Sequence, residues 1–129
     1  MAQIVVSANV AVPNGPNLAF NQIIDVDAYD KIDVAVPAQP TATTDKKVEL
    51  VNGTGDVLFI AITADAYSEK LTYKINAGTT VRKLDQPHLF MGKGGVSLFD
   101  AAPATLLFSN PATGTNANVQ ILIGRDATP

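Results

Sequence analysis

The chain has 129 residues, nine Lys and Arg against twelve Asp and Glu, one His, and neither Cys nor Trp. This length predicts one compact domain, and a net charge of −3 argues against a nucleic-acid binder, which needs a dense cationic surface. Without Cys the chain has no disulfides or thiolate sites, and one His excludes zinc sites built from several imidazoles. Charged residues make up only 16% of the chain, which fits either a surface covered by partners or an uncharged Thr- and Asn-rich surface.

The first half of the chain alternates short apolar runs with turn-forming residues. The runs predicted as strands are residues 4–8, 18–26, 32–36, 47–52 and 57–63. Turn residues at 13–16 and 52–56 separate them, and the Pro- and Thr-rich segment 37–45 predicts a long loop. Residues 1–17 are a candidate N-terminal arm that, like the loop at 37–45, would reach neighbouring subunits of an assembly.

The second half continues the same theme. Leu71, Tyr73 and Ile75 alternate with polar residues, and Val119, Ile121 and Ile123 do the same near the end of the chain. Between these two strands, short strands are predicted at 79–84, 96–99 and 106–108, with a flexible connection at 92–95 and a long polar loop at 110–118. Helical patterning is weak: residues 64–70 and 100–103 make one turn each at most.

About nine or ten short strands separated by turns every 8 to 12 residues predict an all-β fold. We expect one antiparallel β-sandwich domain over residues 1–129, jelly-roll-like and with minimal helix. Val57–Ile62 is apolar at successive positions, so this strand is predicted to lie centrally in its sheet.

Two segments resemble catalytic motifs in part. Gly92–Gly95 has the composition of a phosphate-binding loop, but it lacks the earlier Gly, where Pro87 stands, and a Ser or Thr after Lys93. Gly95–Phe99 begins like a nucleophile elbow without its closing Gly. We therefore favour a plain connection for the first segment and a plain strand for the second.

A serine hydrolase would have to use Ser97 with the only imidazole. His88 would then be oriented by Asp85 or Asp100, and nothing in the spacing selects that arrangement. We expect His88 to be a loop residue after Pro87. The sequence thus predicts no catalytic residue and no cofactor.

Four carboxylates fall within nine residues, which is the pattern a calcium ion would need. The spacing does not match an EF-hand loop, and a solvated acidic strand edge that discourages unwanted pairing is preferred. No metal site is therefore expected, and the weak cation candidates are Asp25, Asp27, Asp30 and Asp33.

Carbohydrate binding by a β-sandwich relies on exposed aromatic platforms. The chain has no Trp and three Tyr, of which Tyr73 is predicted to be in the core. Tyr29 and Tyr67 remain as the only candidates for a sugar platform.

The basic residues are unevenly distributed. Seven of the nine lie between residues 46 and 93: Lys46, Lys47, Lys70, Lys74, Arg82, Lys83 and Lys93. If they lie opposite the acidic cluster, neighbouring copies would meet through complementary charge in a ring or lattice; otherwise they are scattered solvated charges. The interface candidates are Lys46, Lys47, Arg82, Lys83 and Lys93.

Three segments carry a resemblance to a known kind of protein. They are a strand ending in Asn-Gly-Thr at 48–54, an Ile-Asn-Ala-Gly-Thr corner at 75–79, and the apolar strand at 118–124. Together they resemble small virion proteins of tailed bacteriophages, of the head decoration or cement type. The resemblance implies a β-sandwich, commonly a trimer, that bridges subunits of the major capsid protein and has no catalytic residues.

The sequence therefore predicts a non-enzymatic structural virion protein. We expect it on the capsid surface after synthesis in the host cytoplasm, as a homo-oligomer, with the major capsid protein or other virion subunits as partners. No targeting segment or run of 18 apolar residues is visible, so neither a membrane nor a nucleic acid is expected as a partner. The alternatives are a receptor- or glycan-binding module of a tail fibre or adhesin and, third, a small hydrolase.

Overall fold

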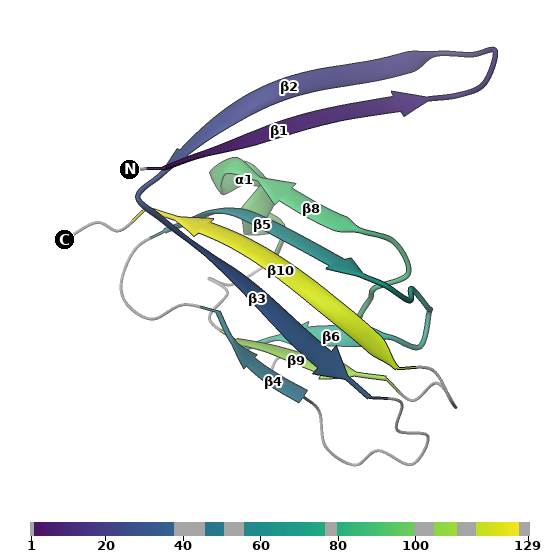
Figure 1. Ribbon diagram of the computed structural model, residues 1–129, viewed down its shortest axis with the longest axis vertical. Coiled ribbons are helices and arrows are strands. Elements are labelled where there is room, and N and C mark those ends of the chain that lie inside the picture. Colours follow the sequence, from purple (N-terminus) through teal and green to yellow (C-terminus); the bar gives the residue numbers. More distant parts are fainter. Residues whose placement is uncertain are drawn as a thin grey trace.

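The computed structural model describes residues 2–37, 46–50, 56–76, 80–99, 105–110 and 116–126. Its strands and helical segments are, in chain order, β1 (Ala2–Ala11), β2 (Asn17–Val26), β3 (Ala28–Val36), β4 (Lys46–Glu49), β5 (Val57–Ala64), β6 (Thr72–Ile75), β7 (Arg82–Lys83), β8 (His88–Met91), α1 (Gly92–Val96), a 3₁₀ turn (Ser97–Phe99), β9 (Thr105–Ser109) and β10 (Ala117–Arg125). Figure 1 shows their arrangement. The all-β prediction is confirmed.

Eight of the strands form two four-stranded sheets, and every pairing is antiparallel. The first sheet has the order β3-β10-β5-β8, and the second has the order β4-β9-β6-β7. Apart from β6 and β7, successive strands alternate between the two sheets, which is the strand order of a jelly roll. β5 lies between β10 and β8, so its predicted central position is confirmed.

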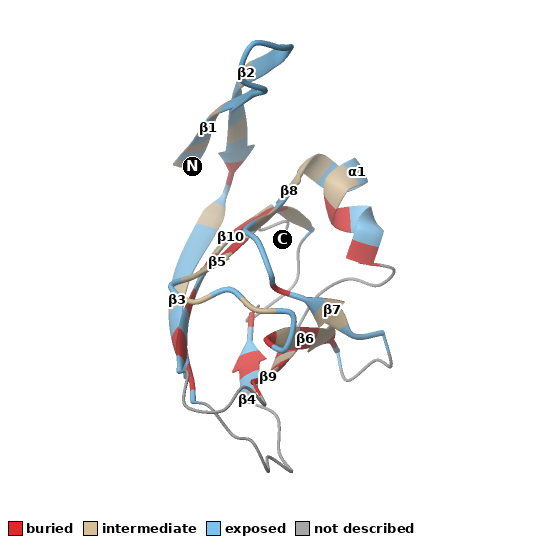
Figure 2. Ribbon diagram, turned by 90° about the vertical axis from the view of Figure 1, so that its right-hand side faces the viewer, coloured by how far each residue is buried: buried red, intermediate tan, exposed pale blue. Residues whose placement is uncertain are grey.

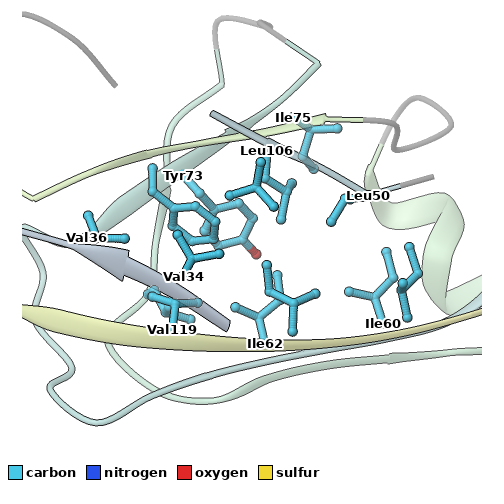
Figure 3. Packing of buried hydrophobic residues seen from close by; sticks show 14 of the residues in the cluster. Val34, Val36, Leu50, Ile60, Ile62, Tyr73, Ile75, Leu106 and Val119 are labelled. Carbon is cyan, nitrogen blue, oxygen red and sulfur yellow. The ribbon is translucent and has the colours of Figure 1, made fainter. Parts of the chain in front are cut away.

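The core lies between these two sheets. Ile60 and Ile62 of β5 and Ile121 of β10 are fully buried on the inner face of the first sheet. Tyr73 of β6 and Phe108 of β9 in the second sheet are also fully buried in the same cluster. Figure 3 shows Tyr73 among Val34, Ile62 and Leu106. The period-two pattern of each strand therefore produces this core, as expected for half-buried antiparallel sheets.

One buried polar residue links the two sheets. Asn110, which follows β9, is 4% exposed, and its side-chain Nδ2 donates a hydrogen bond of 3.2 Å to the carbonyl oxygen of Val36 at the end of β3. Because a buried amide needs a partner, this bond fixes the end of β9 against the end of β3.

Residues 92–99 differ from the prediction. They form α1 and a 3₁₀ turn instead of a flexible connection followed by a strand. Val96 and Phe99 are buried, and their spacing of three places them on one helical face, where the Phe99 ring centroid lies 4.5 Å from that of Phe90. Burying these two side chains together favours helical turns over the predicted strand, and Gly92–Gly95 lie within the five-residue helix instead of in a loop before it.

His88 is also placed differently, because it begins β8 and is not a loop residue. The predicted loops are described only in part: residues 38–45 and 111–115 lie outside the described residues, and Ala117 and Asn118 belong to β10.

The remaining two strands lie apart from the sandwich. β1 and β2 pair with each other in a separate two-stranded sheet, and Figures 1 and 2 show this hairpin extending away from the other strands. The candidate N-terminal arm at 1–17 is thus continued by β2, and residues 2–26 form one projecting unit. We call this unit the arm.

Candidate functional site

The arm is a long and regular hairpin. Ten residue pairs join β1 to β2 without interruption, from Ala2 opposite Val26 to Ala11 opposite Asn17. At about 3.4 Å per residue its strands are about 34 Å long. The turn closes with the backbone N–H of Gly15 donating to the Val12 carbonyl oxygen at 2.8 Å. Because the pairing is continuous, each face of the hairpin presents the same set of side chains along its whole length.

The two faces of the arm differ strongly. Directly opposed residues share a face, and one face carries nine apolar side chains and one Gln; we call it the arm face, and its residues are Ala2, Ile4, Val6, Ala8, Val10, Leu18, Phe20, Gln22, Ile24 and Val26. The opposite face has cross-strand hydrogen bonds from Gln3 to Asp25 at 3.1 Å and from Ser7 to Asn21 at 2.6 Å. That face also carries the exposed pair Val5 and Ile23, so it is mixed whereas the arm face is apolar.

Burial of the arm face decreases from its base to its tip, and Val6, Ala8 and Phe20 in the middle are half-buried. A Cβ atom placed on Gly124 would lie 2.7 Å from Ile4 Cδ1, 2.9 Å from Val26 Cγ1 and 3.6 Å from Phe59 Cβ. The base therefore packs tightly on the outer face of the first sheet, at the one position in β10 where a side chain is absent. Towards the tip, Val10 is 59% exposed and Leu18 is 65% exposed.

The arm also lacks the features that normally keep a free strand from pairing. Residues 2–24 contain no Asp, Glu, Lys, Arg or His. β1 and β2 pair only with each other among the described strands, so each has an open edge. Soluble proteins usually protect such edges with charges, prolines or bulges, and here the only prolines lie in the turn. The arm therefore offers both an apolar face and unprotected edges.

The acidic residues do not converge. The Asp25 carboxylate accepts the bond from Gln3 on the arm, Asp30 Oδ2 lies 3.9 Å from Arg125 Nε, and Asp33 pairs with Lys31 at 3.1 Å. Within the described ranges, no three His, Asp or Glu side chains form a group able to hold a metal ion.

The basic interface candidates are spread over several parts of the molecule. The outer face of the second sheet carries Lys47 and Lys74, which flank Leu107 in the register, and Lys83. Arg82 points to the other side of that sheet, where its guanidinium carbon lies 5.5 Å from the centroid of the Phe99 ring.

The other two interface candidates, Lys93 and Lys46, are not shown on the outer face of the second sheet. Lys93 of α1 pairs with Asp56 at 3.3 Å, and the side chain of Lys46 lies outside the described residues. The three lysines on the second sheet and the aspartates of β3 thus lie on different layers of the sandwich.

The hydrolase candidates are not paired with each other. Ser97 Oγ donates to the carbonyl oxygen of Gly94 at 2.6 Å, and His88 Nδ1 shares a hydrogen bond of 2.7 Å with the Tyr73 hydroxyl. Asp85 is exposed, and Asp100 lies outside the described residues. A serine nucleophile needs the imidazole as its hydrogen-bond partner, and here both groups bond to other residues.

The Tyr73–His88 pair is electrically neutral near pH 7. Burial raises the pKa of the Tyr73 hydroxyl to about 12, with a smaller opposing effect from Arg82. Burial is also the main reason that the pKa of His88 is lowered from its usual 6.5, and the negative charge of Asp85 offsets part of this effect. The pair therefore acts as a neutral polar link between β6 and β8, which belong to different sheets.

We expect His88 to make stability depend on pH. Because its pKa is lower in the folded state, the unfolded chain binds more protons between that pKa and 6.5, and stability rises with pH across this window. The free energy of unfolding should level off above 6.5 and decrease as pH falls below it. Urea unfolding from pH 5 to 8 of the wild type and of His88→Gln measures the effect. A difference between the two proteins that does not vary with pH would contradict it.

The two candidate sugar-binding tyrosines lie far apart. Tyr29, 58% exposed, pairs in register with Gly124 near one end of β10. Tyr67 lies in the loop after β5, where its hydroxyl accepts a hydrogen bond from the backbone N–H of Ala64 at 3.1 Å, and Asp65 of the same loop bonds Asn118 at the other end of β10. Asn118 and Gly124 are six positions apart along β10, about 20 Å, so the tyrosines do not form one platform.

Comparison with protein-family models, with curated proteins and with solved structures returns no match. No helix within the described ranges is long and apolar enough to cross a bilayer. The arm face is thus the feature that the geometry itself singles out.

Sequence reasoning found both strands of the arm but not their significance. The alternation at Ile4, Val6, Ala8 and Val10, the matching alternation in β2, and the charge-free run over residues 2–24 are all visible in the sequence. These signals are typical of any half-buried hairpin. Only the position of the hairpin outside the sandwich shows that its apolar face is half-buried along most of its length and exposed at Val10 and Leu18 near the tip.

Proposed function

We propose that this protein is a non-enzymatic structural component of a virion, of the capsid decoration or cement type. It would bind the outer surface of the shell and bridge neighbouring subunits. The jelly roll supports this proposal only in part, since capsid proteins, lectins and cupins all use that architecture.

The observation that carries the proposal is the arm. It is a rigidly paired extension of about 34 Å that leaves the sandwich and contributes none of the buried residues between the two sheets. Residues 2–24 of the arm carry no charge, and one face is apolar apart from Gln22, so this face is suited to contact with other proteins and unsuited to binding an ionic ligand.

The proposed stabilisation of the shell depends on many copies of the protein binding to it. One arm offers a modest contact area, but copies held side by side on a shell would make each further contact at a high effective concentration. Many weak contacts would then resist the separation of shell subunits, without catalytic groups or a cofactor.

The test uses shells isolated from the virus that encodes this chain, prepared without the protein. Purified protein should bind them to saturation, with a fixed number of copies per shell, and raise the temperature at which the shells break. Sedimentation with the shells measures the first effect, and light scattering during heating measures the second. Absence of saturable binding, or binding with no change in shell stability, would refute the proposal.

A further inference from the structure

We propose that acid opens the sandwich locally at the edge formed by β7 and β8, and that protonation of His88 causes this opening. The opening would detach residues 88–99, which form β8, α1 and the 3₁₀ turn, while the other strands stay paired. The inference goes beyond the effect of pH on global stability, and it does not depend on the proposed function.

A group of five side chains crosses from one sheet to the other at this edge. We call it the edge cluster, and it consists of Tyr73, His88, Phe90, Phe99 and Arg82. The ring centroid of His88 lies 5.6 Å from that of Tyr73 and 6.1 Å from that of Phe90. The Phe99 ring centroid lies 4.5 Å from that of Phe90 and 5.5 Å from the guanidinium carbon of Arg82. His88 is therefore central to the contacts that hold residues 88–99 against the second sheet.

The hydrogen bond in the edge cluster suits a neutral His88. Burial raises the pKa of Tyr73 to about 12, so its hydroxyl keeps the proton and can donate it to His88 Nδ1, 2.7 Å away. A protonated imidazole has an N–H on both ring nitrogens, so Nδ1 can no longer accept. Tyr73 is fully buried, and a buried hydroxyl without an acceptor is costly. Protonation therefore removes the acceptor from the bond that joins β6 to β8.

The surroundings of His88 also disfavour its positive charge. Burial is the main cause of its lowered pKa, and the positive charge of Arg82 adds to the effect. The negative charge of Asp85 and a backbone hydrogen bond with Lys83 oppose this lowering and are outweighed. β5, which pairs with β8, contains no titratable residue, and Lys74 of β6 points to the outer face of the second sheet. Since water would hydrate the imidazolium in the open form, protonation favours opening.

The opposite edge of the sandwich has a link that does not titrate. There Asn110 Nδ2 donates to the carbonyl oxygen of Val36, which joins the end of β9 to the end of β3. The first sheet also holds β8 less firmly than β3, because four residue pairs join β8 to β5 and nine join β3 to β10. Acid should therefore open the edge at β8 and leave the edge at β3 closed.

The test is hydrogen exchange, resolved by residue and corrected for the intrinsic rate at each pH from 7.5 to 5. At pH 5, residues 88–99 should be less protected than β10, because they exchange by local opening and β10 by global unfolding. Their protection should fall about tenfold for each pH unit below 6.5 until the folded pKa of His88 is reached. His88 is the only His, so its ring NMR signals report that pKa, where the fall should level off.

Three variants identify the group responsible. His88→Gln keeps an acceptor for the Tyr73 hydroxyl and cannot be protonated, so residues 88–99 should be equally protected at pH 7.5 and pH 5. Asp85→Asn removes a charge that favours the imidazolium, so the levelling-off should move to lower pH. Asp33→Asn removes the same charge from β3 and should leave the levelling-off in place. Asp85 and Asp33 are both exposed, so their Asn variants should fold.

Three results would overturn the inference. The first is equal protection of residues 88–99 and β10 at pH 5, and the second is a fall in protection that persists in His88→Gln. The third is a levelling-off that moves equally in Asp85→Asn and Asp33→Asn. If His88→Gln does not fold, the wild type and the two Asn variants still decide the question through the first and third results.

Discussion

Replacing Phe108 with alanine is expected to lower the free energy of unfolding by about 3–5 kcal/mol. The side chain is fully buried between the sheets, and its ring centroid lies 5.7 Å from that of Tyr73. Its removal loses the free energy of transferring the side chain from water to the core, and it also leaves a cavity that the neighbouring strands cannot close. Since domains of this size are stable by about 5–15 kcal/mol, the variant should be close to unfolding, which urea denaturation at 25 °C would measure.

The matched control is Leu107→Ala, one residue earlier on the same strand. Leu107 points to the outer face of the second sheet between Lys47 and Lys74, so its loss should be about 1 kcal/mol or less. Phe108→Leu keeps part of the volume and should fold even if the alanine variant does not. Equal losses for Phe108→Ala and Leu107→Ala would show that β9 does not present Phe108 to the core.

Replacing Gly124 with alanine is expected to loosen the base of the arm. The new methyl group would lie within 3 Å of Ile4 Cδ1 and Val26 Cγ1. Ile4 has a mobile end that can move aside, but Val26 is 1% exposed and closely packed. We expect a loss of about 1–3 kcal/mol in the free energy of unfolding, and faster hydrogen exchange of the β1 and β2 amides.

Two variants make this prediction specific. Gly94→Ala adds a methyl group where nothing lies within 4 Å, inside α1, and should be neutral or slightly stabilising. Ile4→Val removes the Cδ1 atom that the Gly124→Ala methyl group would meet, so the double variant should regain part of the loss. If Gly124→Ala left hydrogen exchange in the arm unchanged, the arm would not be anchored on β10.

Most strands could be predicted because alternation is a local property. Leu71, Tyr73 and Ile75, like Val119, Ile121 and Ile123, were assigned to the correct faces from the sequence alone. A half-buried sheet requires this period whatever its neighbours are.

The failures have a common cause. Residues 96–99 are apolar except for Ser97, as in a short strand, but their real environment is the side of β8, where Val96 and Phe99 are both buried. His88, expected in a loop after Pro87, instead begins β8 and bonds Tyr73 of the other sheet. Tertiary contacts determine both conformations, because the intrinsic preferences of so few residues for helix, strand or loop differ little in free energy.

By itself, the sequence determined that this protein is all-β, that alternate residues of its strands are buried, and that residues 2–24 carry no charge. These follow from side-chain chemistry and from the period of a pleated strand. Only the tertiary structure decided that eight strands close into a jelly roll while β1 and β2 leave it, because strand order depends on contacts between distant segments. The hairpin therefore projects from the sandwich with its apolar face half-buried for most of its length and exposed at the tip.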